Sequence, residues 1–110
     1  MGDYLTLRDR HERNLASYRA SVEILKPVLV TYAREQGGAF ILFGSAARGE
    51  ANDTSDVDIL VDFPETSVMT ASGFAERSCW ALGLKPDVRP VIWTSPKVVE
   101  RARAEGVVLS

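Results

Sequence analysis

The sequence has little of what several protein classes need. Cys79 is its one cysteine, which excludes an internal disulfide framework and a four-cysteine zinc site. No apolar run approaches the roughly 20 residues that span a bilayer, and no signal-peptide core follows residues 1–3. The 13 basic and 15 acidic residues lack the basic surplus of a sequence-blind nucleic-acid binder. We therefore expect a small cytoplasmic protein that binds neither membranes nor nucleic acid directly.

The apolar residues predict one folded domain with an N-terminal helical region. Hydrophobic residues make up 45% of the chain, too many for a disordered protein. One helical stripe, with spacings of three and four, is formed by Leu15, Tyr18, Val22, Leu25, Leu29 and Tyr32. Pro27 does not shift its phase, so we predict a kinked or closely stacked continuation that Gly37 and Gly38 end. Residues 1–38 should pack on a core of residues 39–110, and part of the stripe could instead serve a protein interface.

Strand and helix patterns alternate in the rest of the sequence. Strands are predicted at 39–43, 56–63 and 86–93, helices at 70–82 and 96–105, and a small edge strand at 107–109. Between the first two strands, Asn52 and Asp53 mark a polar turn. The alternation predicts an α+β (α/β) fold, a small mixed sheet flanked by helices. Cys79 is expected in its core, and so are Trp80 and Trp93, for which a wall that stacks on a base is the alternative.

Two aspartates stand at the start of the second predicted strand. Because side chains alternate along a strand, Asp56 and Asp58 project from the same face. Neighbouring carboxylates repel each other, and a divalent cation with oxygen ligands removes that conflict. Asp87 in the third predicted strand can add a third carboxylate, if the two strands are neighbours, and accept a proton from an attacking hydroxyl. The pattern predicts a site for two Mg²⁺ ions; the alternative is a solvated strand face.

A glycine and a serine directly follow the first predicted strand. Gly44 permits close backbone approach, while free amides and the Ser45 hydroxyl can hold phosphate oxygens. Arg48 lies in the same short turn and is either a phosphate ligand or a surface charge. A phosphate cradle beside paired carboxylates is what metal-assisted phosphoryl or nucleotidyl transfer needs.

These residues carry a resemblance to a known family. Gly44 and Ser45, then ten residues, then Asp56 and Asp58 form the signature of the polymerase-β-like nucleotidyltransferases. The string FGSAARGEANDTSDVDILVDF resembles the minimal nucleotidyltransferases, the short single-domain branch of that superfamily, over about residues 39–109. The resemblance implies a nucleotidyltransferase fold, with metal-binding and catalytic Asp56, Asp58 and Asp87, and with nucleotide-binding Gly44, Ser45, Arg48 and Ser55.

Minimal nucleotidyltransferases are commonly antitoxins encoded beside a HEPN-domain ribonuclease toxin, and some transfer AMP from ATP to a tyrosine of that toxin. The resemblance therefore implies a Mg²⁺-dependent protein adenylyltransferase in a hetero-oligomer with a cognate HEPN toxin. A chain of 110 residues has little room for a complete acceptor pocket. Such a partner would supply the second wall of the site. Two alternatives stay open: a binding-only antitoxin that acts by occlusion, and a subunit that modifies a small molecule such as an aminoglycoside.

Overall fold

The computed structural model describes residues 7–51 and 54–110, and its centre is a four-stranded mixed sheet. The strands lie in the order β3-β2-β1-β4 and comprise β1 (Ala39–Phe43), β2 (Val57–Asp62), β3 (Pro86–Pro90) and β4 (Val107–Leu109). β1 is antiparallel to both β2 and β4, whereas β2 and β3 are parallel. The mixed sheet predicted from the sequence is confirmed. The predicted turn residues Asn52 and Asp53 lie outside the described residues.

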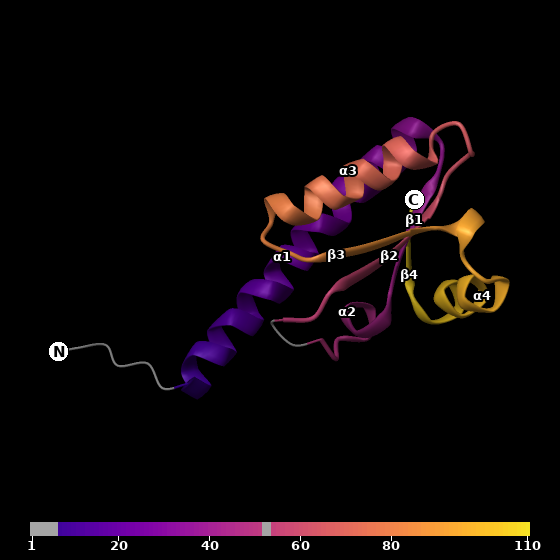
Figure 1. Cartoon of the computed structure of the whole chain (residues 1–110). Helices are drawn as coiled ribbons and strands as arrows, with labels where there is room; N and C mark the ends of the chain where they lie inside the picture. The colour runs from indigo at the N-terminus through magenta and orange to yellow at the C-terminus, as the bar shows by residue number, and fades with distance from the viewer. Residues whose placement is uncertain (1–6, 52–53) are drawn as a thin grey trace.

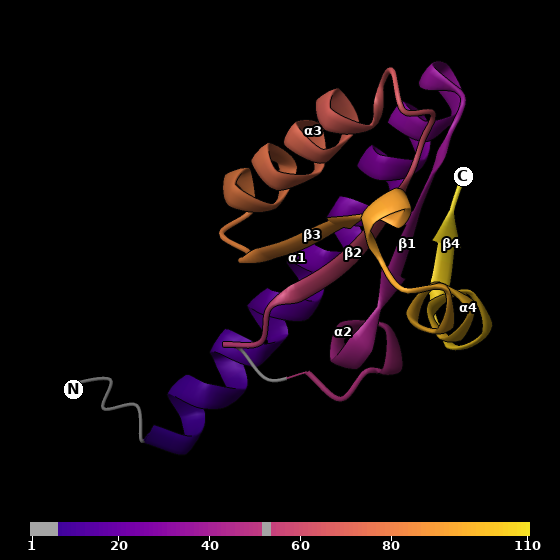
Figure 2. The same ribbon diagram turned by 45° about the vertical axis from the view of Figure 1, so that its right-hand side comes forward.

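Helices cover the two faces of the sheet unequally. They are α1 (Leu7–Gln36), α2 (Gly44–Arg48), α3 (Val68–Ala81) and α4 (Pro96–Glu105). Figures 1 and 2 show α1 and α3 on one side of the sheet and α4 on the other. The larger core cluster includes Val57, Ile59 and Val61 of β2. A smaller cluster joins Ile41 and Leu60 to α4. Because α4 is short, it covers only part of its face.

The N-terminal region is a single helix of 30 residues that continues through Pro27. Its buried residues keep the predicted period and are Tyr18, Val22, Leu25, Leu29 and Ala33. Tyr32 is half-buried and stacks on Phe74 of α3, with ring centroids 4.1 Å apart. The helix ends at Gln36, where the amides of Gly37 and Gly38 both donate to the Ala33 carbonyl. The stripe therefore joins α1 to the sheet and to α3.

Two predictions about the third strand and the tryptophans are wrong. The strand ends at Pro90 instead of residue 93, because residues 91–93 form a short 3-10 helix closed by hydrogen bonds from Thr94 to the Val91 and Pro90 carbonyls. Trp93 at its end is 68% exposed. Trp80 is 61% exposed because it follows the buried Cys79 by one residue, which turns it about 100° away from the buried side of α3.

Other boundaries differ little from the prediction. β2 covers residues 57–62 of the predicted 56–63, and α3 begins at Val68, two residues before the predicted start. α4 spans 96–105 as predicted, with the Ser95 hydroxyl accepting from the Val98 amide. None of the described helices combines the length and apolarity needed to cross a membrane.

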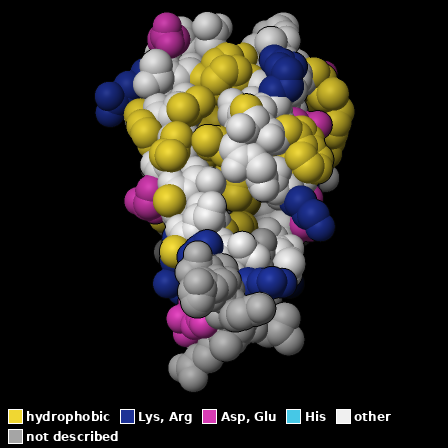
Figure 3. Space-filling view, turned by 90° about the vertical axis from the view of Figure 1, so that its left-hand side faces the viewer, with side chains coloured by type: hydrophobic (Ala, Val, Ile, Leu, Met, Phe, Trp, Pro, Cys, Tyr) yellow, Lys and Arg dark blue, Asp and Glu magenta, His cyan; other side chains and the backbone are white. Residues whose placement is uncertain are grey.

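Apolar side chains also occur on the surface. Figure 3 shows hydrophobic side chains on one face, interspersed with charged ones. The larger exposed hydrophobic residues among those described are Ile24, Val28, Met69, Trp80, Ile92, Trp93, Val98, Val107 and Val108. Burial in the core therefore does not account for the hydrophobic side chains at these positions.

The attachment of α1 can be tested at two adjacent residues. Leu25 is 1% exposed and Ile24 is 53% exposed. We expect Leu25→Ala to lower the free energy of unfolding by about 2–5 kcal/mol, because it leaves a cavity between α1 and the sheet. Ile24→Ala should change it by less than about 0.5 kcal/mol. Denaturant unfolding measures both, and equal losses would show that the buried stripe does not hold α1.

Candidate active site

The parallel pairing of β2 and β3 places two aspartates side by side. Asp58 is the register partner of Asp87 in the ladder, so their backbones lie about 4.8 Å apart. Asp58 alternates with the fully buried Val57 and Ile59, and therefore projects toward the face that α4 covers only in part. The condition under which Asp87 can join the other acids, that its strand is a neighbour of the Asp58 strand, is therefore met.

Asp58 and Asp87 share a hydrogen bond, and their pKa values move apart. Burial raises the pKa of Asp58 to about 6, with further contributions from the hydrogen bond with Asp87 and from the charge of Asp87. The pKa of Asp87 is lowered, chiefly by a hydrogen bond from Arg89. Below about pH 6 Asp58 is thus the carboxyl of the pair that is protonated, while Asp87 stays ionised.

Arg89 supplies the positive charge next to this pair. Its Nη2 lies 3.0 Å from Oδ2 of Asp87, and its Nε lies 3.3 Å from Oδ1. Arg89 is two residues after Asp87 in β3, so both side chains project from the same face of the sheet. No motif in the sequence assigns Arg89 a role. Only the geometry of its contact identifies it as the counter-ion of the acid pair.

Gly44 makes the first turn of α2 approach Asp58 closely. β1 ends at Phe43, the register partner of Asp58, and α2 begins at the next residue. Gly44 has a φ of 74°, in the left-handed region, and a Cβ atom there would overlap Oδ2 of Asp58. Only glycine fits both the backbone conformation and the space. The predicted proximity of the glycine–serine step to the carboxylates is therefore present, with Ser45 half-buried in the same turn.

Three other predicted site residues lie outside these contacts, although the charge of Asp56 is close enough to help raise the pKa of Asp58. Asp56 is exposed at the position before β2. Arg48 is exposed, its Nε lies 3.2 Å from Glu50, and it lines the hollow beside Gly44, so both alternatives for Arg48 stay open. Ser55 lines a separate cavity of about 110 Å³ with Tyr18 of α1. The structure thus brings together Gly44, Ser45, Asp58 and Asp87 of the predicted set.

The carboxyl groups of Asp58 and Asp87, two of the three predicted ligands, lie side by side and are of the kind that binds a divalent cation. Among the described residues, no group of three His, Cys, Asp or Glu side chains is arranged to hold a metal ion. Asp58 and Asp87 nevertheless present adjacent carboxyl oxygens that compete for one proton. Oxygen donors of this kind are what Mg²⁺ prefers. Asp56 precedes Asp58 by two residues, and its side chain would have to turn inward to complete the set.

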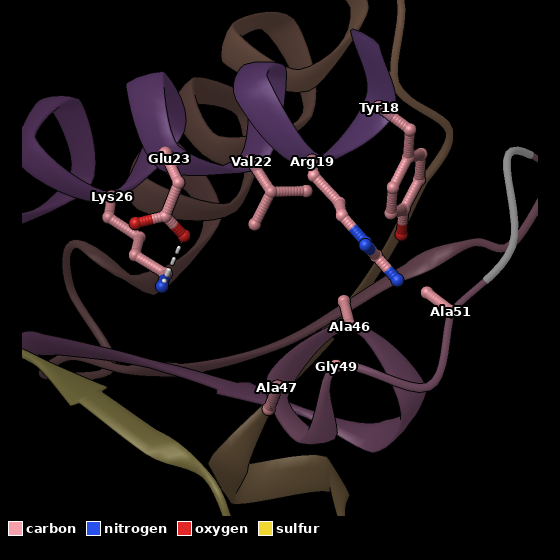
Figure 4. A pocket seen from close by; sticks show the side chains of 9 residues that line it. All are labelled: Tyr18, Arg19, Val22, Glu23, Lys26, Ala46, Ala47, Gly49 and Ala51. Atoms are coloured by element: carbon pink, nitrogen blue, oxygen red, sulfur yellow. Dashed lines mark hydrogen bonds and ion pairs between the residues drawn. The ribbon is translucent and has the colours of Figure 1, made fainter. Parts of the chain in front are cut away.

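Two hollows flank α2. One, of about 250 Å³, lies between α2 and α4 and is lined by Phe43, Gly44, Arg48, Val98, Arg101, Ala102 and Glu105. The other is a cleft of about 500 Å³ between α1 and α2, shown in Figure 4, where Arg19 points from α1 toward Ala51. The smaller hollow adjoins Gly44 and is therefore on the side of the acid pair.

The comparisons with known proteins identify the family and the fold. The nucleotidyltransferase domain family matches residues 23–109, most of the chain. The chain belongs to the nucleotidyltransferase domain family. A solved structure of a candidate minimal nucleotidyltransferase aligns with a TM-score of 0.62 and 25% identity, covering 81% of this chain and 93% of that one. The mixed sheet flanked by helices is thus a nucleotidyltransferase fold.

A second solved structure, of a candidate nucleotidyltransferase from Sulfolobus solfataricus, is 23% identical and covers 98% of this chain and 89% of that one. Its TM-score of 0.32 is too low to add to the argument. No curated protein matches the chain.

The raised pKa of Asp58 predicts how the stability of this nucleotidyltransferase domain depends on pH. The pKa is about 6 in the folded state against 3.8 for a free Asp, so the folded state holds the extra proton between these values. Stability from Asp58 is present in full below about pH 4 and is lost as the pH rises through about 6. We expect a loss of about 1–2 kcal/mol after allowance for solvent screening. The lowered pKa of Asp87 acts in the opposite direction, at lower pH.

Denaturant unfolding between about pH 4 and pH 7.5, with a chelator present, measures this dependence. Asp58→Asn should remove it, because the amide does not titrate. Asp62→Asn is the matched control, since Asp62 lies in the same strand but pairs with Arg103 of α4 at 2.6 Å. A slope that survives in Asp58→Asn would show that another group titrates.

The contact between Gly44 and Asp58 gives a second test. Gly37→Ala and Gly44→Ala impose similar backbone strain, about 1 kcal/mol, since both glycines have a positive φ. A Cβ at Gly37 meets nothing within 4 Å, whereas one at Gly44 meets the Asp58 carboxyl. We expect Gly44→Ala to cost more unfolding free energy and, alone of the two, to move the pKa of Asp58 measured by NMR. Equal effects on both quantities would mean that α2 shifts freely away from β2.

Proposed function

We propose that this chain is a Mg²⁺-dependent protein adenylyltransferase that transfers AMP from ATP to a hydroxyl, and that the acceptor is a tyrosine of a HEPN-domain toxin. In this proposal the chain is the cytoplasmic antitoxin of the pair. The observation that carries the transferase part is the contact of the Asp58–Asp87 pair with the glycine that opens α2. Membership of the nucleotidyltransferase family supports the reaction type.

Each residue of the site would have its own part in the reaction. Asp58 and Asp87, with Asp56 turned inward, would hold Mg²⁺, which supplies charge neutralisation at the phosphates. Gly44 and Ser45 would receive the triphosphate at the first turn of α2. The acceptor oxygen bonds to the α-phosphorus, the bond from that phosphorus to the bridging oxygen breaks, and pyrophosphate leaves. Asp87, which Arg89 keeps ionised, accepts the proton of the hydroxyl.

The openness of the site supports a macromolecular acceptor. The hollow that adjoins Gly44 measures about 250 Å³, below the roughly 300–1,000 Å³ typical of pockets that enclose a small-molecule ligand. α4 leaves the face around Asp58 and Asp87 partly uncovered. A protein acceptor can bring the missing wall of the site with it, which a small molecule cannot do. This feature favours the protein over the aminoglycoside-like substrate.

Mass spectrometry of the intact partner tests the proposal. The chain is incubated with the HEPN protein encoded beside it, Mg²⁺ and ATP, and the partner is then weighed. We expect the added mass of AMP, and a loss of at least about 100-fold in its rate of formation for Asp58→Asn. Asp62→Asn, on the same face of β2 but paired with Arg103, should keep the wild-type rate.

Toxin assays with the same variants separate catalysis from occlusion. If Asp58→Asn neutralises the toxin as well as the wild type does, neutralisation works by binding alone and the adenylyltransferase proposal is wrong. If AMP appears only on small-molecule hydroxyls, the acceptor class is wrong while the reaction type stands.

A further inference from the structure

The cleft between α1 and α2 has no part in the proposed reaction. Its volume of about 500 Å³ falls within the roughly 300–1,000 Å³ typical of pockets that enclose a small-molecule ligand. None of the predicted site residues, all of which the structure describes, lines it. It is formed by α1, on the side of the sheet opposite to α4, whereas Asp58 projects toward the α4 side. The cleft is therefore a separate candidate for a ligand site.

Arg19 gives the wall of this cleft a positive charge. Within the part of the chain that the structure describes, its guanidinium has no ion pair. Figure 4 shows the side chain running from α1 toward Ala51. The other two charged side chains of the lining, Lys26 and Glu23, neutralise each other in an ion pair of 2.6 Å. The lining thus keeps the charge of Arg19 in excess, which favours an anionic ligand.

Tyr18 adds a hydroxyl to the same wall. The residue is only 8% exposed, and its hydroxyl has no hydrogen-bond partner among the described residues. A buried polar group without a partner is costly and uncommon in folded proteins. In Figure 4 the polar ends of Tyr18 and Arg19, which are adjacent in α1, both point toward the α2 side of the cleft. Two donors that lack acceptors therefore line one cleft.

The rest of the lining is small and apolar. The half-buried Ala46 and Ala47 come from α2, and the buried Val22 comes from α1. Such side chains leave room for the body of a ligand and offer it no polar partner. The cleft thus combines donors for an anionic group with an apolar surface, which is the usual composition of a small-molecule site.

We propose that this cleft binds a small organic anion, whose carboxylate or phosphate group accepts hydrogen bonds from the Arg19 guanidinium and the Tyr18 hydroxyl. The planar guanidinium suits both kinds of group, because its parallel donors match their paired oxygens. The apolar body of the ligand lies against the two alanines of α2. The site goes beyond the proposed function and does not depend on it, since it uses no predicted metal or nucleotide ligand.

Titration of the labelled full chain with benzoate and with phenyl phosphate, followed by NMR, tests the site. Benzamide is the matched neutral probe, because it keeps the ring and removes the charge. We expect saturable shifts of the Val22 and Ala46 amides with at least one of the anions, and an affinity for benzamide at least about 10-fold weaker. The two anions show whether the site prefers a carboxylate or a phosphate group.

Substitutions in α1 test the two donors. Arg19→Gln and Tyr18→Phe should each weaken binding of the preferred anion about 10- to 100-fold, since each removes a hydrogen bond to a charged group. Arg34→Gln and Tyr32→Phe are the matched controls, because both residues belong to α1 and neither lines the cleft. They should bind like the wild type. Without ligand, Tyr18→Phe should unfold at a temperature no lower than the wild type, because it loses only an unpartnered hydroxyl.

Four results would overturn the site. Wild-type affinity in Arg19→Gln would show that the guanidinium does not hold the anion, and wild-type affinity in Tyr18→Phe would show that solvent alone satisfies the hydroxyl. Benzamide that binds as tightly as the anions would rule out an anionic ligand. Shifts confined to Gly44 and Ser45 would place the anions at the predicted phosphate-binding turn instead, and no saturable binding of either anion would leave the cleft without a ligand of this class.

Discussion

The side-by-side placement of Asp58 and Asp87 on parallel strands is the constraint on which the rest of the site depends. Two carboxylates this close cannot both ionise without compensation. The guanidinium of Arg89 compensates part of the charge, and below about pH 6 a proton on Asp58 compensates more. Neither is bound permanently to the pair, because a proton exchanges with solvent and Arg89 is more than half exposed. A divalent cation carries more charge than a proton and would neutralise the two carboxylates more fully.

The stability needed to hold like charges together comes from the opposite face of the sheet. There α1 and α3 bury the alternate residues of β2, and the rings of Tyr32, Phe40, Phe63 and Phe74 pack at centroid distances of 4.1–5.9 Å. Burial of this kind fixes the register of a strand, since a slip of one residue would turn Val57 and Ile59 to solvent. The same register sets which residues face each other across β2 and β3. Core packing on one face therefore determines the electrostatics of the other.

Close backbone approach completes the arrangement and links it to α1. Gly44 lets α2 begin against the carboxyl of Asp58, and a side chain there would displace it. Tyr18 of α1 also reaches this end of the sheet, since it shares a cavity with Ser55, Leu84 and Lys85 where β2 and β3 begin.

The sequence by itself determined most of the strand and helix bounds and named the candidate carboxylates, because hydrophobic period and residue spacing are local properties of the chain. It also placed Gly44 at the close approach, since glycine after a buried strand is a local signal. Only the tertiary structure decided that Asp87 faces Asp58 and that Arg89 is the counter-ion of Asp87. It also turned Trp80 and Trp93 outward and left Arg48 with Glu50. These features depend on which strands become neighbours and how helices rotate against the sheet, and such long-range pairings leave no periodic trace in the sequence.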